Sequence, residues 1–296
     1  MSTLTITNTV QRRFILGKQG LWPGRRWQGK AGAAQAIYQM GALQIDPLAV
    51  VARSHDLKLH SRVLDYAPEH LDTLLYTERR FFDYGGWLAI FPMEELPYWR
   101  LHMKRHLGDA QWDKFANDSP QVIDMVRTEL RTRGPLGHRD FKGQRVESYR
   151  ARKDSGLALY YLWRIGELMT SRRRGFDRIY DFTENIAPEV HRTRLVSDDD
   201  AEWYFERKVF TIANIMTFSQ WRSSVNYYVR RTIPIHEAKE IFAAHLERGE
   251  FSSLKVEGSK ETHYVLSENL TLIDALLTGK IPEQWQTDNK IGRAHV

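Results

Sequence analysis

The sequence predicts a mainly helical α+β fold in which several modules each combine a few helices with a small β-hairpin. Two observations lead to this class: apolar residues recur at helical spacing in most segments, and short β-rich runs occur in pairs around glycine. The third observation is length, because 296 residues is long for a single hydrophobic core. We therefore expect several domains.

The first module is expected to span residues 1–116. Its predicted elements are helices at 10–21, at 31–40, from Pro47 to about Leu64 and from Pro68, and strands at 80–84 and 87–91. The two strands flank Gly85 and Gly86, which suit a tight connection. Helices followed by a two-stranded ribbon are the plan of a winged-helix domain.

Two later modules, residues 117–192 and 193–286, repeat this plan. The second begins at a Ser119-Pro120 helix start, and its expected elements are helices at 120–133, 138–142 and 157–165 with strands at 167–173 and 177–182. In the third we expect helices at 200–212, 219–229 and 235–248 and a hairpin at 251–266 that turns at Gly258. The modules resemble each other in plan and not as a sequence repeat. The sequence thus predicts tandem winged-helix domains.

Composition narrows the classes of function. The chain has no cysteine, which excludes disulfides, thiolate zinc sites and a cysteine nucleophile and suits the cytoplasm. It has no apolar run long enough to cross a bilayer, so we expect no membrane partner. The formal charge is +6, and ten Lys or Arg against five Asp or Glu place +5 of it between residues 142 and 182. Such a local excess favours a polyanion, above all nucleic acid.

The arginine-rich hairpin is the expected wing of the second module. Arg172, Arg173 and Arg174 would contact phosphate rather than read bases, beside a helix able to enter a groove. The alternative is a solvated edge strand whose charges only discourage aggregation.

Gln44, Ile45 and Asp46 form the most informative triplet of the chain. In an extended segment Gln44 and Asp46 leave on one side while Ile45 turns into the core. An amide and a carboxylate on one surface can position and polarise a water and stabilise positive charge on a sugar ring. Pro47 makes Asp46 the expected N-cap of the next helix, near its positive end, where the carboxylate should stay ionised. The alternative is that Asp46 is a cap and nothing more.

Three stretches of sequence resemble the AlkZ/YcaQ family of winged-helix DNA glycosylases. The first is Leu-Gln-Ile-Asp-Pro at residues 43–47 with Val-Val-Ala-Arg-Ser-His at 50–55 and His-Ser-Arg at 60–62. The second is Arg-Gly-Pro-Leu at 133–136 with Asp140 and Phe141, and the third is the run at 172–181. The resemblance covers most of residues 10–286 and is weaker in the third module.

This resemblance implies a monofunctional glycosylase that removes N3- or N7-alkylated purines from double-stranded DNA, in some members including cross-linked purines. It implies Gln44 and Asp46 as the catalytic residues, in the Gln-Ile-Asp form of the motif, and it implies no metal or other cofactor. The residues expected to bind DNA are Arg53, Ser54, His55, Arg62, Arg164, Arg172, Arg173, Arg174 and Arg222. Relatives tend to have a histidine near the position of Trp87, which leaves the substrate range open.

Some expectations and alternatives stay open at this stage. A damaged base can be flipped out of the duplex or attacked in place. We expect a monomer that works at the nucleoid. A winged-helix regulator without enzymatic activity, or a helical interaction scaffold, would share parts of the pattern. Residues 291–296 resemble translated adapter sequence, so we expect the tail 287–296 to be a truncation artefact and the chain to lack the C-terminal β-barrel of the family.

Overall fold

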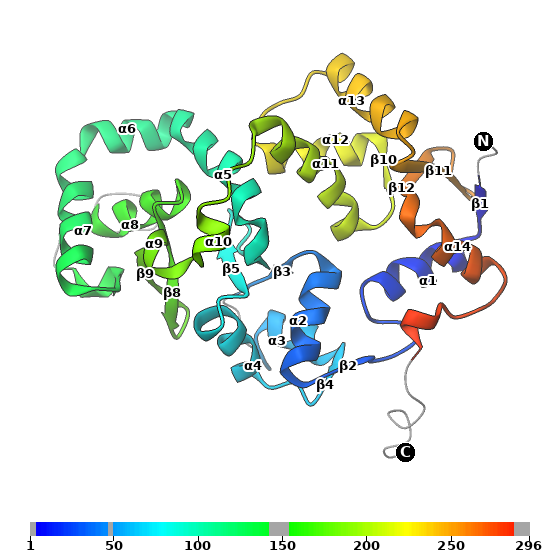
Figure 1. Ribbon diagram of the computed structural model, residues 1–296, viewed down its shortest axis with the longest axis horizontal. Helices are drawn as coiled ribbons and strands as arrows, with labels where there is room; N and C mark the ends of the chain where they lie inside the picture. Colours follow the sequence, from blue (N-terminus) through cyan, green and yellow to red (C-terminus); the bar gives the residue numbers. More distant parts are fainter. Residues whose placement is uncertain (1–3, 47–49, 142–153, 287–296) are drawn as a thin grey trace. The chain divides into compact units, whose positions relative to one another are not determined.

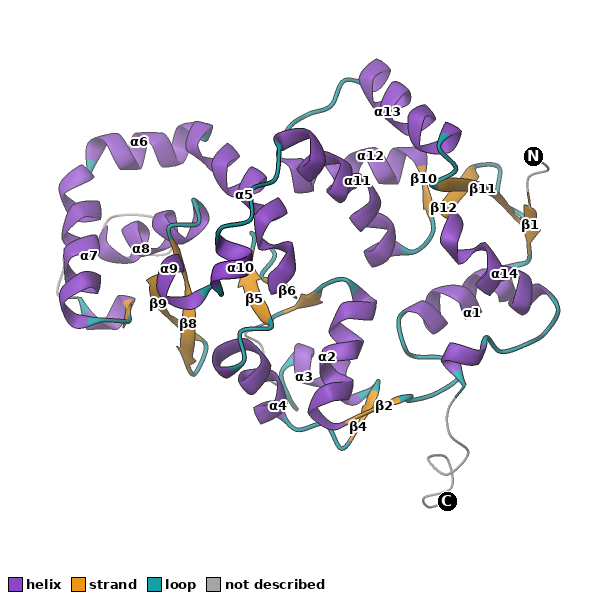
Figure 2. Ribbon diagram, in the orientation of Figure 1, coloured by secondary structure: helices purple, strands orange, loops and turns teal. Residues whose placement is uncertain are grey.

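The computed structural model describes residues 4–46, 50–141 and 154–286 (Figure 1). Helices dominate and several small sheets accompany them, as the predicted α+β class requires (Figure 2). The chain forms two compact units. Unit 1 comprises Met1–Leu43, Ser54–Leu71 and Glu202–Val296, and unit 2 comprises Gln44–Arg53 and Asp72–Ala201.

Unit 1 joins the two ends of the chain. Its helices are α1 (Asn8–Lys18), α2 (Gly29–Met40), α3 (Ser54–His60), α4 (Pro68–Asp72, ending at the unit boundary), α11 (Asp198–Ala213, which crosses it), α12 (Phe218–Val229), α13 (Ile235–Glu247) and α14 (Leu270–Leu277). Its strands are β1 (Leu4–Ile6), β2 (Trp27–Gln28), β4 (Val63–Leu64), β10 (Met216–Thr217), β11 (Phe251–Val256) and β12 (Thr262–Leu266).

A four-stranded sheet of order β1-β11-β12-β10 ties these ends together. β1 pairs in parallel with β11, with Leu4 opposite Leu254, and β11 and β12 form an antiparallel hairpin. A core that includes Phe14 of α1, Ile273 of α14 and Trp285 lies on this sheet. A separate short ladder pairs β2 with β4. The N-terminal segment is therefore stabilised by residues that lie about 250 positions further along the chain.

Unit 2 holds the middle of the chain. Its helices are α5 (Leu96–Lys104), α6 (Ala110–Asp118), α7 (Pro120–Arg133), α8 (Asp154–Arg164), α9 (Thr183–Ile186) and α10 (Glu189–Arg192). Its strands are β3 (Leu43–Gln44, at the unit boundary), β5 (Phe81–Tyr84), β6 (Ala89–Pro92), β7 (Leu136–Gly137), β8 (Leu168–Arg174) and β9 (Asp177–Phe182). They form two three-stranded sheets, β3-β6-β5 and β7-β9-β8.

Local sequence explains where many elements begin and end. Thr7 caps α1 by accepting a hydrogen bond from the N–H of Val10 at 3.2 Å. α7 begins at Pro120, whose missing N–H is not needed at that position, and ends at Gly134, whose φ is +80°. Gly175 and Gly258, both at positive φ, lie in the connections of the two later hairpins. These hairpins and their preceding helices lie close to where the sequence predicts them.

The structure differs from the expected helix after Pro47 and divides the chain differently from the expected modules. A single helix from Pro47 to Leu64 is wrong, because residues 50–53 are not helical, α3 begins only at Ser54, and Val63 and Leu64 form β4. The compact units also cut the chain at other places than the expected boundaries 116/117 and 192/193, so the division into three modules stays a prediction. The tail 287–296 and the start of the basic stretch, residues 142–153, lie outside the described residues.

Candidate active site and nucleic-acid interface

Residues 44–46 have the alternation that the sequence predicts. Gln44 is exposed, Ile45 is 5% exposed, and Asp46 is half-buried. β3 joins the sheet through β6, and the N–H of Ile45 donates a hydrogen bond of 2.6 Å to the carbonyl oxygen of Leu88. Gln44 is thus the last residue of β3, Asp46 follows two residues later, and the hydrogen bond of Ile45 holds the backbone between them.

The turn between β5 and β6 lies beside residues 44–46. Gly85 has φ +87°, and Leu88 has φ +49°, a conformation that side chains other than glycine rarely adopt. Leu88 closes the turn by donating its N–H to the carbonyl of Gly85 at 3.1 Å. Trp87 lies half-buried in this turn, directly before the residue that binds Ile45. The turn is therefore part of the surroundings of residues 44–46.

Arg53 does not share a helix face with Asp46. The expected spacing depended on a helix that starts at Pro47, but residues 50–53 are non-helical and Pro47 itself lies outside the described residues. Arg53 and Ser54 are both half-buried, and Ser54 opens α3. Helical periodicity therefore does not bring Arg53 or Ser54 close to Asp46. Since residues 50–53 are not helical, they also do not continue the long helix whose dipole was expected to act on Asp46.

The hairpin of β8 and β9, here called the arginine hairpin, separates its three consecutive arginines. Arg172 and Arg174 are exposed, whereas the side chain of Arg173 is only 9% exposed. Arg173 donates from Nη1 to the carbonyl of Phe176 at 2.9 Å and from Nη2 to the carboxylate of Asp83. Since strand side chains alternate, two arginines face outward and one faces inward. This placement argues against the expected contact of Arg173 with DNA.

Asp83 of β5 is the buried counter-ion of the arginine hairpin. Its side chain is 1% exposed, and its Oδ2 also lies 3.4 Å from Nε of Arg178 on β9. Burial works to raise the pKa of Asp83, but Arg173 and Arg178 outweigh it and hold the pKa below its usual value. Arg178 stacks over the ring of Trp163 at 4.1 Å. Asp83 is therefore a carboxylate between two guanidinium groups.

Two further arginines that were expected to bind DNA make hydrogen bonds to backbone carbonyls of the protein. In unit 1, Arg62 is buried and donates to the carbonyls of Gln19 at 2.6 Å and Lys58 at 2.7 Å. Burial lowers the pKa of Arg62. Arg222, also of unit 1, donates from both Nε and Nη2 to the carbonyl of Ile233, at 2.9 and 2.6 Å. Both guanidinium groups support the fold, which argues against the expected phosphate contacts.

Two further expected DNA residues lie in less open surroundings than the sequence suggested. His55 is buried in α3. Arg164 is half-buried in unit 2 and contacts the hydroxyl of Tyr160 at 3.2 Å and Nδ1 of His106 at 3.0 Å. The structure thus gathers Gln44, Asp46 and the arginine hairpin within unit 2 and assigns His55, Arg62 and Arg222 to unit 1.

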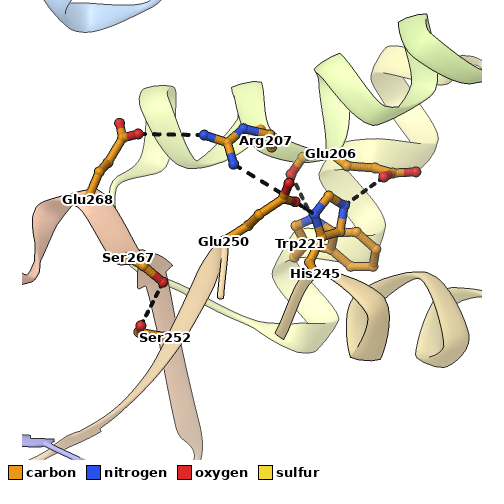
Figure 3. Close-up of polar contacts among 8 residues, drawn as sticks. All are labelled: Glu206, Arg207, Trp221, His245, Glu250, Ser252, Ser267 and Glu268. Carbon is orange, nitrogen blue, oxygen red and sulfur yellow. Dashed lines mark hydrogen bonds and ion pairs between the residues drawn. The ribbon is translucent and has the colours of Figure 1, made fainter. Parts of the chain in front are cut away.

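Sequence reasoning missed two buried polar clusters. One is Asp83 with its two arginines, and its signal was an aspartate inside an otherwise apolar strand. The other is His245 of unit 1, whose Nε2 lies 2.7 Å from Oε2 of Glu206 and whose Nδ1 contacts the carboxylate of Glu250 (Figure 3). No spacing in the sequence links these three residues.

Neither cluster resembles a metal site. Within residues 4–46, 50–141 and 154–286, no group of three His, Asp or Glu side chains is arranged to hold a metal ion. Over the same residues, no helix combines the length and the apolar character that crossing a bilayer demands.

Comparison with known proteins bears on both the family and the fold of this chain. The model of a family described as "DNA glycosylase AlkZ-like" matches residues 37–280, which include Gln44, Asp46 and the arginine hairpin. Among solved structures, the DNA glycosylase AlkZ of Streptomyces sahachiroi has a similar fold, with a TM-score of 0.64 and 14% sequence identity. The match covers 92% of this chain and 73% of that chain. At this identity the structural likeness speaks for the fold, and the family match speaks for the activity.

Proposed function

Because the chain belongs to the AlkZ-like DNA glycosylase family, we propose that it hydrolyses the N-glycosidic bond of N3- or N7-alkylated purines in double-stranded DNA. The proposal includes purines in interstrand crosslinks. The observation that carries it is the triplet at residues 44–46, where a buried Ile45 separates an exposed amide from a half-buried carboxylate. Family membership favours an enzyme over the alternative of a non-enzymatic DNA-binding regulator.

The chemistry follows from the charge of the substrate. An alkylated purine carries positive charge and leaves with the electron pair of the C1′–N bond, so it needs little help from an acid. The sugar becomes oxocarbenium-like, and the carboxylate of Asp46 stabilises this charge and takes a proton from the attacking water. Gln44 orients that water. The products are the free base and an abasic sugar with a hydroxyl at C1′.

The DNA-binding surface that we propose rests on four arginines of unit 2, two of them exposed. Arg172 and Arg174 are exposed on the arginine hairpin, and Arg53 and Arg164 are half-buried. In unit 1, Ser54 at the start of α3 offers a neutral hydroxyl that can donate to phosphate. We propose three winged-helix domains, as the sequence predicts. The second is supported by α7 and α8 beside the sheet β7-β9-β8, and the third by α11, α12 and α13 with the hairpin β11–β12 and β10. We also expect the enzyme to act as a monomer.

The test is a base-release assay on a duplex with one N7-alkylguanine, followed by alkaline cleavage at the abasic site. Wild-type protein should cleave at that position, and Asp46→Asn should lower the single-turnover rate by about 10²-fold or more while it binds the duplex as before. Asp118→Asn, the same change at an exposed position on α6, is the matched control and should keep the wild-type rate.

The outcomes separate the alternatives. Wild-type protein that binds the duplex but releases no base from any alkylated purine would leave the regulator as the better explanation. Release that persists in Asp46→Asn would remove Asp46 from the mechanism and leave the family assignment intact. A preference for intact over alkylated duplex, measured by competition, would contradict the proposed substrate class.

A further inference from the structure

The cross-strand pair of the arginine hairpin creates an electrostatic problem. Arg173 on β8 lies directly opposite Arg178 on β9, and their side chains are only 9% and 12% exposed. Like charges opposite each other in an antiparallel pair destabilise it, and burial strengthens their repulsion. The hairpin can keep this pair only if an anion lies between the two guanidinium groups.

Asp83 supplies that anion from another sheet. Its Oδ2 contacts Nη2 of Arg173 and lies 3.4 Å from Nε of Arg178. Asp83 belongs to β5, which contacts β8 within unit 2. Since a buried ion is costly unless it is paired, the three side chains are stable only together. The arginine hairpin is therefore held to β5 by a carboxylate that neither strand of the hairpin provides.

The same strand leads to residues 44–46. In the antiparallel pair of β5 and β6, Asp83 lies opposite Ile90 and Tyr84 opposite Ala89. β6 is in turn the neighbour of β3, and the carbonyl of Leu88, directly before β6, receives the N–H of Ile45. The path from the arginine hairpin to Asp46 thus crosses the ion pairs of Asp83 and one small sheet, all in unit 2.

We propose that Asp83 is a positioning residue that fixes the arginine hairpin to the sheet of Gln44 and Asp46, so that DNA held by the hairpin lies in register with the catalytic motif. This inference rests on the proposed function. Arg172 and Arg174 contact the phosphates of the DNA backbone. Because Asp83 fixes the hairpin to the sheet, this contact aligns the sugar of the damaged nucleotide with Gln44 and Asp46. Alignment matters for rate, because a displacement of about 1 Å can cost on the order of 10²-fold.

The experiment measures base release from a pre-formed complex at saturating protein, together with the dissociation constant of the duplex. Asp83→Asn removes the charge and keeps the shape. We expect the single-turnover rate to fall about tenfold or more and the dissociation constant to change by less than about threefold.

The matched control is another ion pair that ends at the same hairpin. Glu167, next to β8, accepts hydrogen bonds from Nε and Nη2 of Arg127 at 2.7 and 2.6 Å, and so ties the hairpin to α7 and not to the sheet of Gln44. Glu167→Gln should lower the melting temperature and leave the rate from the complex within about twofold of wild type. An equal fall in both variants would mean that lost stability alone explains the effect and would overturn the inference.

A milder variant covers the case in which Asp83→Asn does not fold. Arg173→Lys keeps the positive charge against Asp83 but loses the planar fork that also binds Phe176. It should melt near the wild-type temperature and release base about threefold more slowly from the complex. An unchanged rate in a folded Arg173→Lys or Asp83→Asn protein would refute the positioning role. Wild-type protein without any release would instead refute the proposed function itself.

Discussion

The backbone N–H of Ile45 binds the carbonyl oxygen of Leu88 at 2.6 Å, and Leu88 itself has a φ of +49°. A residue in a left-handed conformation therefore binds the backbone between the two proposed catalytic residues, Gln44 and Asp46. The conformation costs about 1–2 kcal/mol for an ordinary side chain, and the surrounding turn must compensate for this cost.

The turn can be tested at Leu88. Leu88→Val places a β-branched residue at positive φ and should lower the free energy of unfolding by about 1–2 kcal/mol and slow base release with it. Leu88→Asn, which tolerates this conformation, should keep the rate closer to wild type. Urea denaturation and single-turnover assays measure both. Equal behaviour of the two variants would show that the backbone conformation has no influence on residues 44–46.

The two exposed arginines of the hairpin should account for part of the salt dependence of DNA binding. Arg172→Ala and Arg174→Ala should each weaken binding to any duplex and make the slope of log K against log salt shallower by about one. Arg174 also lies 3.4 Å from Asp140, so its slope change should be the smaller one. Lys114→Ala, an equal loss of charge at an exposed site on α6, serves as control and should keep the wild-type slope.

The inward-facing arginines of unit 1 should behave differently. Arg222→Ala removes two hydrogen bonds to the carbonyl of Ile233. It should lower the free energy of unfolding by about 1–3 kcal/mol and leave the salt slope unchanged. Binding titrations at several salt concentrations, with melting curves beside them, measure both quantities. A shallower slope with an unchanged melting temperature would restore Arg222 as a phosphate contact.

The cluster around His245 should stabilise unit 1. The two ring nitrogens of His245 lie within hydrogen-bond distance of the carboxyl groups of Glu206 and Glu250 (Figure 3). His245→Ala would leave the buried carboxylate of Glu206 without this partner, at a cost of about 3–5 kcal/mol in urea denaturation. His236→Ala, on the exposed face of the same helix, should change stability by less than about 0.5 kcal/mol. A cost below about 1 kcal/mol for His245→Ala would mean that the ion pairs contribute little.

Asp83 gives stability a defined dependence on acid. Its pKa is lower in the folded protein than in the unfolded chain, so its contribution is fully present above the unfolded value near 4 and is lost as the pH falls through the folded value. The difference in unfolding free energy between wild type and Asp83→Asn should be constant above about pH 5 and shrink below about pH 4. Denaturation at several pH values measures this difference. If the difference in unfolding free energy also shrinks between pH 6 and 8, the pH dependence belongs to a group other than Asp83.

Local sequence was sufficient for most helices and hairpins. The helix that begins at Pro120 and ends before Gly134 and the hairpins around Gly175 and Gly258 depend on residues close in the chain, whose periodicity and turn chemistry can be read directly. The failure between Pro47 and Leu64 has a tertiary cause. Val63 and Leu64 form β4, which pairs with β2 at Trp27 and Gln28, a partner that periodicity cannot reveal.

Alternation and short motifs were enough to predict the fold class, the burial of Ile45 between the less buried Gln44 and Asp46, and the family. Which arginines can reach a ligand, in contrast, depends on contacts between distant segments of the fold. Arg172, Arg173 and Arg174 are equivalent in sequence, yet Arg173 faces Asp83, and Asp83 comes from a strand about 90 residues earlier. Whether a charged side chain is exposed or paired depends on contacts between distant segments, and no local sequence pattern carries that information.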